Sequence, residues 1–207
     1  MKKIVIFASG SGSNAEKIIL HFNKKNQVSV VGMLTNNLNA KVLDKAKKHF
    51  VPTTVFSKEE LNKGNVLAIL NQLQPDLIIL AGFLLKFPET IIKQYPNKIL
   101  NIHPSLLPKY GGKGMYGMNV HQAVLDNKEK ETGITIHYVN ENYDEGGIIF
   151  QKEINIENCK TPEEIAGSNL NLCKNNGIAA PKKPLTICVP KTATPKTKLK
   201  YKSCFQK

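Results

Sequence analysis

Residues 3–16 read Lys3-Ile4-Val5-Ile6-Phe7-Ala8-Ser9-Gly10-Ser11-Gly12-Ser13-Asn14-Ala15-Glu16. The apolar, β-branched run over residues 3–8 predicts a buried strand. The glycines that follow favour a tight turn, and the spacing Ser13-x-x-Glu16 predicts a capping box at the start of an amphipathic helix. The chain therefore opens with a predicted strand, glycine-rich turn and helix in direct succession.

The same alternation of strand and helix continues along the chain. Further strands are expected at residues 28–34, 53–56, 77–81, 98–102, 132–139 and 148–156. The run at residues 77–81 is continuously apolar, as in parallel sheets that are buried on both faces. Repeated units of this length predict a single α/β domain with a doubly wound, mostly parallel sheet, and they place a ligand crevice at the carboxyl ends of the strands.

Helices are expected between the strands. The helix that follows candidate cap Asn39 is expected to bury a face formed by Val42, Leu43, Ala46 and Phe50. A second capping box, Ser57-x-x-Glu60, predicts the start of a helix that Pro75 closes.

The last predicted helix opens at residues 161–164 and is expected to break at Gly167-Ser168-Asn169. From there the composition changes, because residues 167–207 hold nine lysines and no acidic residue, whereas residues 1–166 hold 20 lysines and 16 acidic residues. We therefore expect one domain over residues 1–166. The Lys- and Pro-rich tail over residues 167–207 is expected to be disordered or to come from a change of reading frame.

Composition excludes several classes of protein. The formal net charge of +13 comes mainly from the tail, and the chain contains no arginine for bidentate contacts with bases or phosphate, so nucleic-acid binding is not expected. The four cysteines form no C-x-x-C pair, which argues against zinc. The longest apolar run, residues 77–85, is too short for a membrane helix. We expect a cytoplasmic protein that acts on small molecules.

The glycine-rich turn Gly10-Ser11-Gly12-Ser13-Asn14 is a candidate anion site. Its backbone N–H groups can surround a phosphate, and the N-terminus of the following helix adds the positive end of its dipole. A dinucleotide site would want an acidic or a basic residue near the end of the next strand, and Thr35-Asn36-Asn37 supplies neither. The alternative is a turn that serves only strand-to-helix packing.

A second candidate site follows the strand at residues 98–102. Asn101 and His103 are two residues apart in an extended stretch, so their side chains can converge on one reacting group. An amide can donate to a developing oxyanion, and an imidazole can transfer a proton near neutral pH. Asp144, in the loop at residues 142–147, could approach the histidine and raise its pKa. The alternatives are a structural histidine and a surface hairpin turn.

Taken together, these segments resemble one family in order and spacing. The features that carry the resemblance are Gly10–Asn14, Leu80-Ala81-Gly82-Phe83, the run at residues 101–110 and Asp144-x-Gly. They resemble the folate-dependent formyltransferases, and among them the phosphoribosylglycinamide formyltransferases of purine synthesis. The resemblance covers residues 1–166 and implies a Rossmann-like fold, 10-formyltetrahydrofolate as co-substrate, no metal, and a monomer or weak homodimer.

The resemblance also implies three groups of site residues. The implied contacts with phosphoribosylglycinamide are Gly12, Ser13 and Asn14. The implied folate contacts are Leu84, Leu85, Lys86, Phe87 and Asn101. The implied catalytic group is Asn101, His103 and Asp144, in which Asp144 keeps His103 protonated while His103 and Asn101 stabilise the oxyanion.

Three other functions stay open at this point. One is a formyltetrahydrofolate hydrolase or another folate-dependent formyl transfer. Another is a protein that binds folate or phosphate without turnover, because its altered C-terminus has removed a substrate contact. The third is a protein whose basic tail docks on nucleic acid or acidic surfaces.

Overall fold

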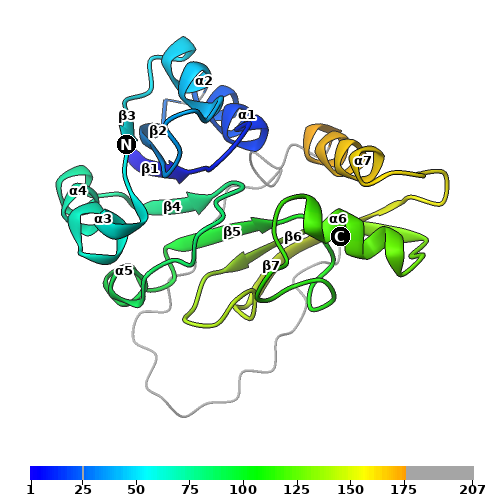
Figure 1. The fold of residues 1–207 in the computed structure, drawn as a ribbon. Helices are drawn as coiled ribbons and strands as arrows, with labels where there is room; N and C mark the ends of the chain where they lie inside the picture. Colours follow the sequence, from blue (N-terminus) through cyan, green and yellow to red (C-terminus); the bar gives the residue numbers. More distant parts are fainter. Residues whose placement is uncertain (25, 176–207) are drawn as a thin grey trace, which may run out of the picture.

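The computed structural model describes residues 1–24 and 26–175 of the chain, and these form one twisted sheet with helices packed against it (Figure 1). The strands are β1 Lys2–Phe7, β2 Val28–Thr35, β3 Thr53–Val55, β4 Leu77–Leu80, β5 Ile99–His103, β6 Glu131–Tyr138 and β7 Ile148–Asn155. Their order in the sheet is β3-β2-β1-β4-β5-β6-β7. Strands β1 to β5 are parallel, whereas β6 runs antiparallel to both β5 and β7. The predicted doubly wound, mostly parallel sheet is confirmed.

The helices are α1 Ser13–Phe22, α2 Val42–Lys48, α3 Lys58–Asn62, α4 Asn65–Leu73, α5 Glu89–Gln94, α6 Met118–Asp126 and α7 Pro162–Asn175. Within the described residues, no helix is long and apolar enough to cross a bilayer.

Strand β1 shows why helices cover both faces of the sheet. Ile4 and Ile6 pack with the apolar residues of α1 and α2, whereas Val5 and Phe7 pack with those of α3, α4 and α5. Successive side chains of a strand point to opposite faces, so a continuously apolar strand needs a helical layer on each side. The two cores that result hold the carboxyl ends of the central strands in place.

The two predicted capping boxes have different outcomes. The box at Ser57 is present, since its hydroxyl accepts from Glu60 N at 3.1 Å and Glu60 Oε2 accepts from Ser57 N at 2.7 Å. The box at Ser13 is wrong. Gly12 is the N-cap of α1, and the carboxylate of Glu16 pairs with Lys45 at 3.0 Å instead.

Two expectations about helical segments in the first half are also wrong. The single helix expected between Ser57 and Pro75 is two helices, because Gly64 adopts φ 93° between α3 and α4. Phe50 does not join the buried face of α2: the helix ends at Lys48, Phe50 takes φ 56°, and its side chain is 95% exposed. Val42 and Ala46 are buried, as expected.

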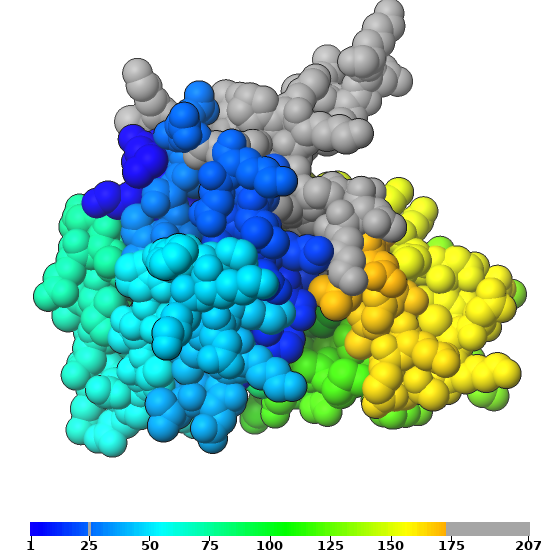
Figure 2. Space-filling view, turned by 90° about the horizontal axis from the view of Figure 1, so that it is seen from above, coloured from blue at the N-terminus to red at the C-terminus, as the bar shows by residue number. Residues whose placement is uncertain are grey.

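The break expected at Gly167-Ser168-Asn169 is wrong, because α7 continues through it to Asn175. Ile165, Asn169 and Leu172 are all buried, at a spacing that repeats on one face of a helix. Ile165 packs against Val124 of α6. Figure 2 shows α7 beside α1 at the surface, where the two helices are in contact. Of the predicted tail, residues 176–207 lie outside the described residues.

Adjacent residues on α1 provide a test of this packing. Ile19 is fully buried and Leu20 is 42% exposed. Ile19→Ala is expected to lower the free energy of unfolding by about 2–5 kcal/mol, since it leaves a cavity between α1 and the sheet. Leu20→Ala should cost under about 1 kcal/mol. Urea denaturation measures both, and equal losses would contradict this orientation of α1.

Candidate active site

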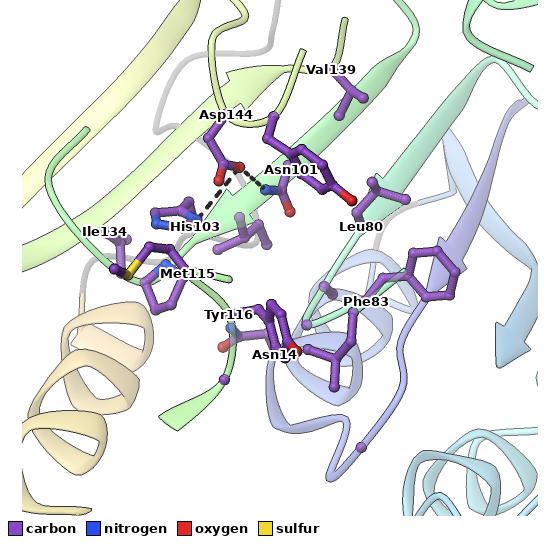
Figure 3. A pocket seen from close by; sticks show the side chains of 18 of the residues that line it. Asn14, Leu80, Phe83, Asn101, His103, Met115, Tyr116, Ile134, Val139 and Asp144 are labelled. Atoms are coloured by element: carbon purple, nitrogen blue, oxygen red, sulfur yellow. Dashed lines mark hydrogen bonds and ion pairs between the residues drawn. The ribbon is translucent and has the colours of Figure 1, made fainter. Parts of the chain in front are cut away.

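A cavity of about 460 Å³ lies at the carboxyl ends of β1, β4 and β5. This is the edge at which ligands bind in doubly wound sheets. The predicted site residues all line it: Gly12, Ser13, Asn14, Leu84, Leu85, Lys86, Phe87, Asn101, His103 and Asp144. In Figure 3 the side chains of Asn101, His103 and Asp144 lie on one wall, across the cavity from Asn14 and Phe83. The fold therefore brings the three predicted groups into one space.

The glycine-rich turn forms one end of the cavity. Gly12 has φ 66° and is the N-cap of α1, so the first N–H groups of the helix are not used within it. An added Cβ on Gly12 would lie 2.3 Å from Val42 Cγ2 and 2.9 Å from Val42 Cα. The turn thus serves packing and also presents a helix N-terminus to the cavity, which suits an anion.

Asp144 lies at the centre of the polar wall. Its Oδ1 accepts from Asn101 Nδ2 at 3.2 Å and lies 3.6 Å from His103 Nδ1 and 3.5 Å from His137 Nε2. Its Oδ2 accepts from Gly112 N at 3.0 Å. One carboxylate therefore contacts groups from β5, from β6 and from the loop before α6.

Opposing effects act on the pKa of His103. Burial lowers it below its ordinary value, because the imidazole is only 3% exposed and desolvation disfavours its charged form. The charge of Asp144 raises it, as predicted, and so does the hydrogen bond to the Tyr110 carbonyl, but they only partly oppose the effect of burial. The protonated His103 that the resemblance implies stays a prediction.

The pKa of Asp144 is lowered as well. Burial alone would raise it, but the interaction with His137, the charge of His103 and the Gly112 N–H hold it below its ordinary value. The lowered pKa keeps Asp144 in its carboxylate form beside the His103 imidazole.

The hydrogen bonds fix the orientation of both imidazoles. His103 Nε2 donates to the Tyr110 carbonyl at 2.8 Å, so Nδ1 faces Asp144. His137 Nδ1 donates to the Tyr138 carbonyl at 2.8 Å, and its Nε2 faces both Asn101 Nδ2, at 3.1 Å, and Asp144. The predicted donation by Asn101 to an oxyanion requires an N–H group that Asp144 does not use.

Sequence reasoning missed three polar residues of the cavity: His121, His137 and Asn169. His137 could have been found from the hairpin register, since β5 and β6 pair Asn101 with His137. His121 on α6 and Asn169 on α7 are buried, and His121 Nδ1 and Asn169 Oδ1 have no partner in the structure. The helix of His121 was not predicted, and the helix of Asn169 was expected to break at residues 167–169, so no sequence signal placed either residue here.

Residues 84–87 form the apolar wall, and they are exposed to different degrees. Leu84 is 44% exposed, whereas Phe87 is 4% exposed and packs edge-on against Phe7 with ring centroids 5.1 Å apart. Lys86 Nζ lies 5.6 Å from the centre of the Tyr143 ring, which comes from the facing loop. Phe87 thus supports the wall, while Leu84 and Tyr143 are available to a flat ring.

The described residues contain no cluster of three or more His, Cys, Asp or Glu side chains arranged to hold a metal ion.

The fold that carries this cavity is shared with a family of transferases. A family model described as Formyl transferase matches residues 2–177, and the chain belongs to this family. The match also extends beyond residue 166, where the resemblance was expected to end.

Relatives within the family carry a more specific name. The chain is 38% identical to phosphoribosylglycinamide formyltransferase, chloroplastic, from Arabidopsis thaliana, over 80% of this chain and 59% of the relative. It is 37% identical to phosphoribosylglycinamide formyltransferase from Bacillus subtilis, over 80% of this chain and 85% of the relative. The solved Bacillus halodurans phosphoribosylglycinamide formyltransferase superposes with TM-score 0.76 at 32% identity, covering 86% and 93% of the two chains. The chain thus spans less than two thirds of the plant relative.

The two glycines of the anion loop differ in how much space surrounds them. An added Cβ on Gly12 meets Val42, at a positive φ, whereas nothing lies within 4 Å of one on Gly10. Gly12→Ala is expected to destabilise the protein by about 2 kcal/mol or more, and Gly10→Ala by less than about 1 kcal/mol. Thermal or urea unfolding measures the pair. Similar losses of stability in the two variants would show that the turn does not require glycine at position 12.

Proposed function

We propose that the chain transfers the formyl group of 10-formyltetrahydrofolate to the amine of 5-phosphoribosylglycinamide, a step of purine synthesis. The observation that supports this best is the convergence of an anion loop, an apolar wall and the Asn101–His103–Asp144 group on one cavity. The names of the relatives agree with this choice of substrates.

The two substrates fit different ends of the cavity. The phosphate of the acceptor would accept hydrogen bonds from the backbone N–H groups of Gly12, Ser13 and Asn14 and would face the positive end of the α1 dipole. The pterin ring would lie on the wall of residues 84–87, with the loop at residues 140–144 opposite. The amine and the formyl group then meet beside Asn101 and His103.

The geometry supports the following chemistry. The acceptor amine attacks the formyl carbon, so a new C–N bond forms and the formyl oxygen becomes an oxyanion. Asn101 donates one N–H to this oxyanion. His103 assists transfer of the proton that the amine nitrogen loses to N10 of the folate, which takes it up as the C–N10 bond breaks. The Asp144 carboxylate stabilises positive charge on His103.

We further propose that the reaction takes place in the cytoplasm and that the chain acts as a monomer or a weak homodimer. Asn169 of α7 lines the cavity, and its Oδ1 has no partner, so this residue is expected to contact the acceptor. It lies in the segment that the sequence analysis assigned to the tail.

The direct test is release of tetrahydrofolate from 10-formyltetrahydrofolate by the full-length chain, with and without phosphoribosylglycinamide. Release that requires the acceptor supports the proposal. Release without the acceptor would indicate a hydrolase. Binding of the folate without release in either case would indicate a protein that has lost turnover.

Two substitutions test the roles of the polar wall. Asn101→Ala and His103→Ala are each expected to lower kcat by about 10²- to 10³-fold, because each removes a group that acts on the oxyanion or the transferred proton. His49→Ala is the matched control, since His49 lies outside the cavity, near Glu16. Turnover within a few fold of the parent in either cavity variant would remove that residue from the mechanism.

A further inference from the structure

One buried hydroxyl connects the two halves of the cavity. Ser9 lies between β1 and the anion loop, and it is 5% exposed. Its Oγ donates to Asn36 Oδ1 at 2.6 Å and accepts from Leu84 N at 3.0 Å. Asn36 follows β2, and Leu84 is the first residue of the apolar wall after β4. The hydroxyl therefore bridges loops from three neighbouring strands.

The backbone of Ser9 makes the same connections. Its N–H donates to the Gly82 carbonyl at 3.0 Å, and its carbonyl accepts from Asn37 Nδ2 at 3.3 Å. All polar groups of this residue thus have partners in the loops that follow β2 and β4. Breaking this network costs free energy, because a buried polar group that loses its partner cannot form a replacement hydrogen bond with water.

Ser9 and Asn36 do not line the cavity, whereas the residues on either side of this network do. Gly10 follows Ser9 directly in the anion loop, and Leu84 begins the wall. Phe83 and Phe87 pack edge-on against Phe7, so the core holds the inner side of this segment. The Leu84 backbone between them is joined to the anion loop by the Ser9 hydroxyl, and Gly82, at φ 78°, forms the turn before it. The hydrogen bonds of Ser9 therefore link the Leu84 end of the wall to the anion loop.

We propose that the Ser9 hydroxyl, held by Asn36, is a positioning group that sets the spacing between the anion loop and the apolar wall. A ligand that contacts both the anion loop and the apolar wall binds with full affinity only when this spacing is kept. The consequence for affinity rests on the function proposed above, whereas the structural role of the hydroxyl does not. Loss of the hydroxyl should weaken binding of both substrates, although Ser9 contacts neither.

The structural role is tested by hydrogen–deuterium exchange on the full-length chain without ligand. In Ser9→Ala, amide exchange in residues 82–87 is expected to rise by about tenfold or more, because the Leu84 N–H loses its acceptor. Ser57→Ala is the matched control: it removes an exposed hydroxyl hydrogen bond at the start of α3, away from the cavity, and should leave exchange in residues 82–87 unchanged. Exchange in this segment within twofold of the parent in Ser9→Ala would overturn the proposal.

Kinetics then separate positioning from general destabilisation. Ser9→Ala is expected to raise KM for both substrates by roughly five- to twentyfold while kcat changes less than about threefold. Asn36→Ala should behave in the same way, and Asn36→Asp, which keeps an oxygen to accept from Ser9, should restore both values of KM. A rise in KM for only one substrate, or no rescue by Asn36→Asp, would contradict a shared spacing role. A parent protein without turnover would contradict the proposed function, and the exchange result would still decide the role of Ser9.

Discussion

The carboxylate of Asp144 is the interaction on which the arrangement of the polar wall depends. It is 12% exposed and lies within hydrogen-bond or ion-pair range of Asn101, His103, His137 and the Gly112 N–H. A buried charge is tolerated only where such partners compensate for its lost hydration. The same contacts orient the two side chains that the proposed reaction uses. Removing the carboxylate would leave Asn101 and His103 in place on β5 without the group that sets their orientation.

The sheet explains how these partners meet. Parallel strands β1, β4 and β5 end at one edge and bring the anion loop, the apolar wall and the Asn101–His103 pair together. The change to an antiparallel strand at β6 then returns His137 opposite Asn101. The following turn, in which Asp144 has φ 56°, directs its carboxylate back over β5. Helix α7 closes this side, since Asn169 Nδ2 donates to the Pro104 carbonyl at 2.9 Å.

The sequence predicts those features that local patterns control. Apolar runs located the seven strands of residues 1–24 and 26–175. The Ser57 box is present because the Ser57 backbone is extended, as an N-cap requires. Where the sequence failed, long-range contacts outweighed the local pattern: Glu16 pairs with Lys45 rather than with its own helix, and α7 passes Gly167 because Ile165 and Leu172 are buried. The site residues could be located from a motif, but the pKa of His103 could not, since it depends on burial by segments distant in sequence.

The most direct test of the central role of Asp144 is an NMR titration of the His103 imidazole in the parent and in Asp144→Asn. Because burial lowers the pKa of His103 and the Asp144 charge opposes that effect, the parent should titrate below the ordinary value for histidine. The variant should titrate at still lower pH, since the imidazolium loses its nearest negative charge. A pKa at or above the ordinary value in the parent, or the same pKa in both proteins, would contradict this description of the site.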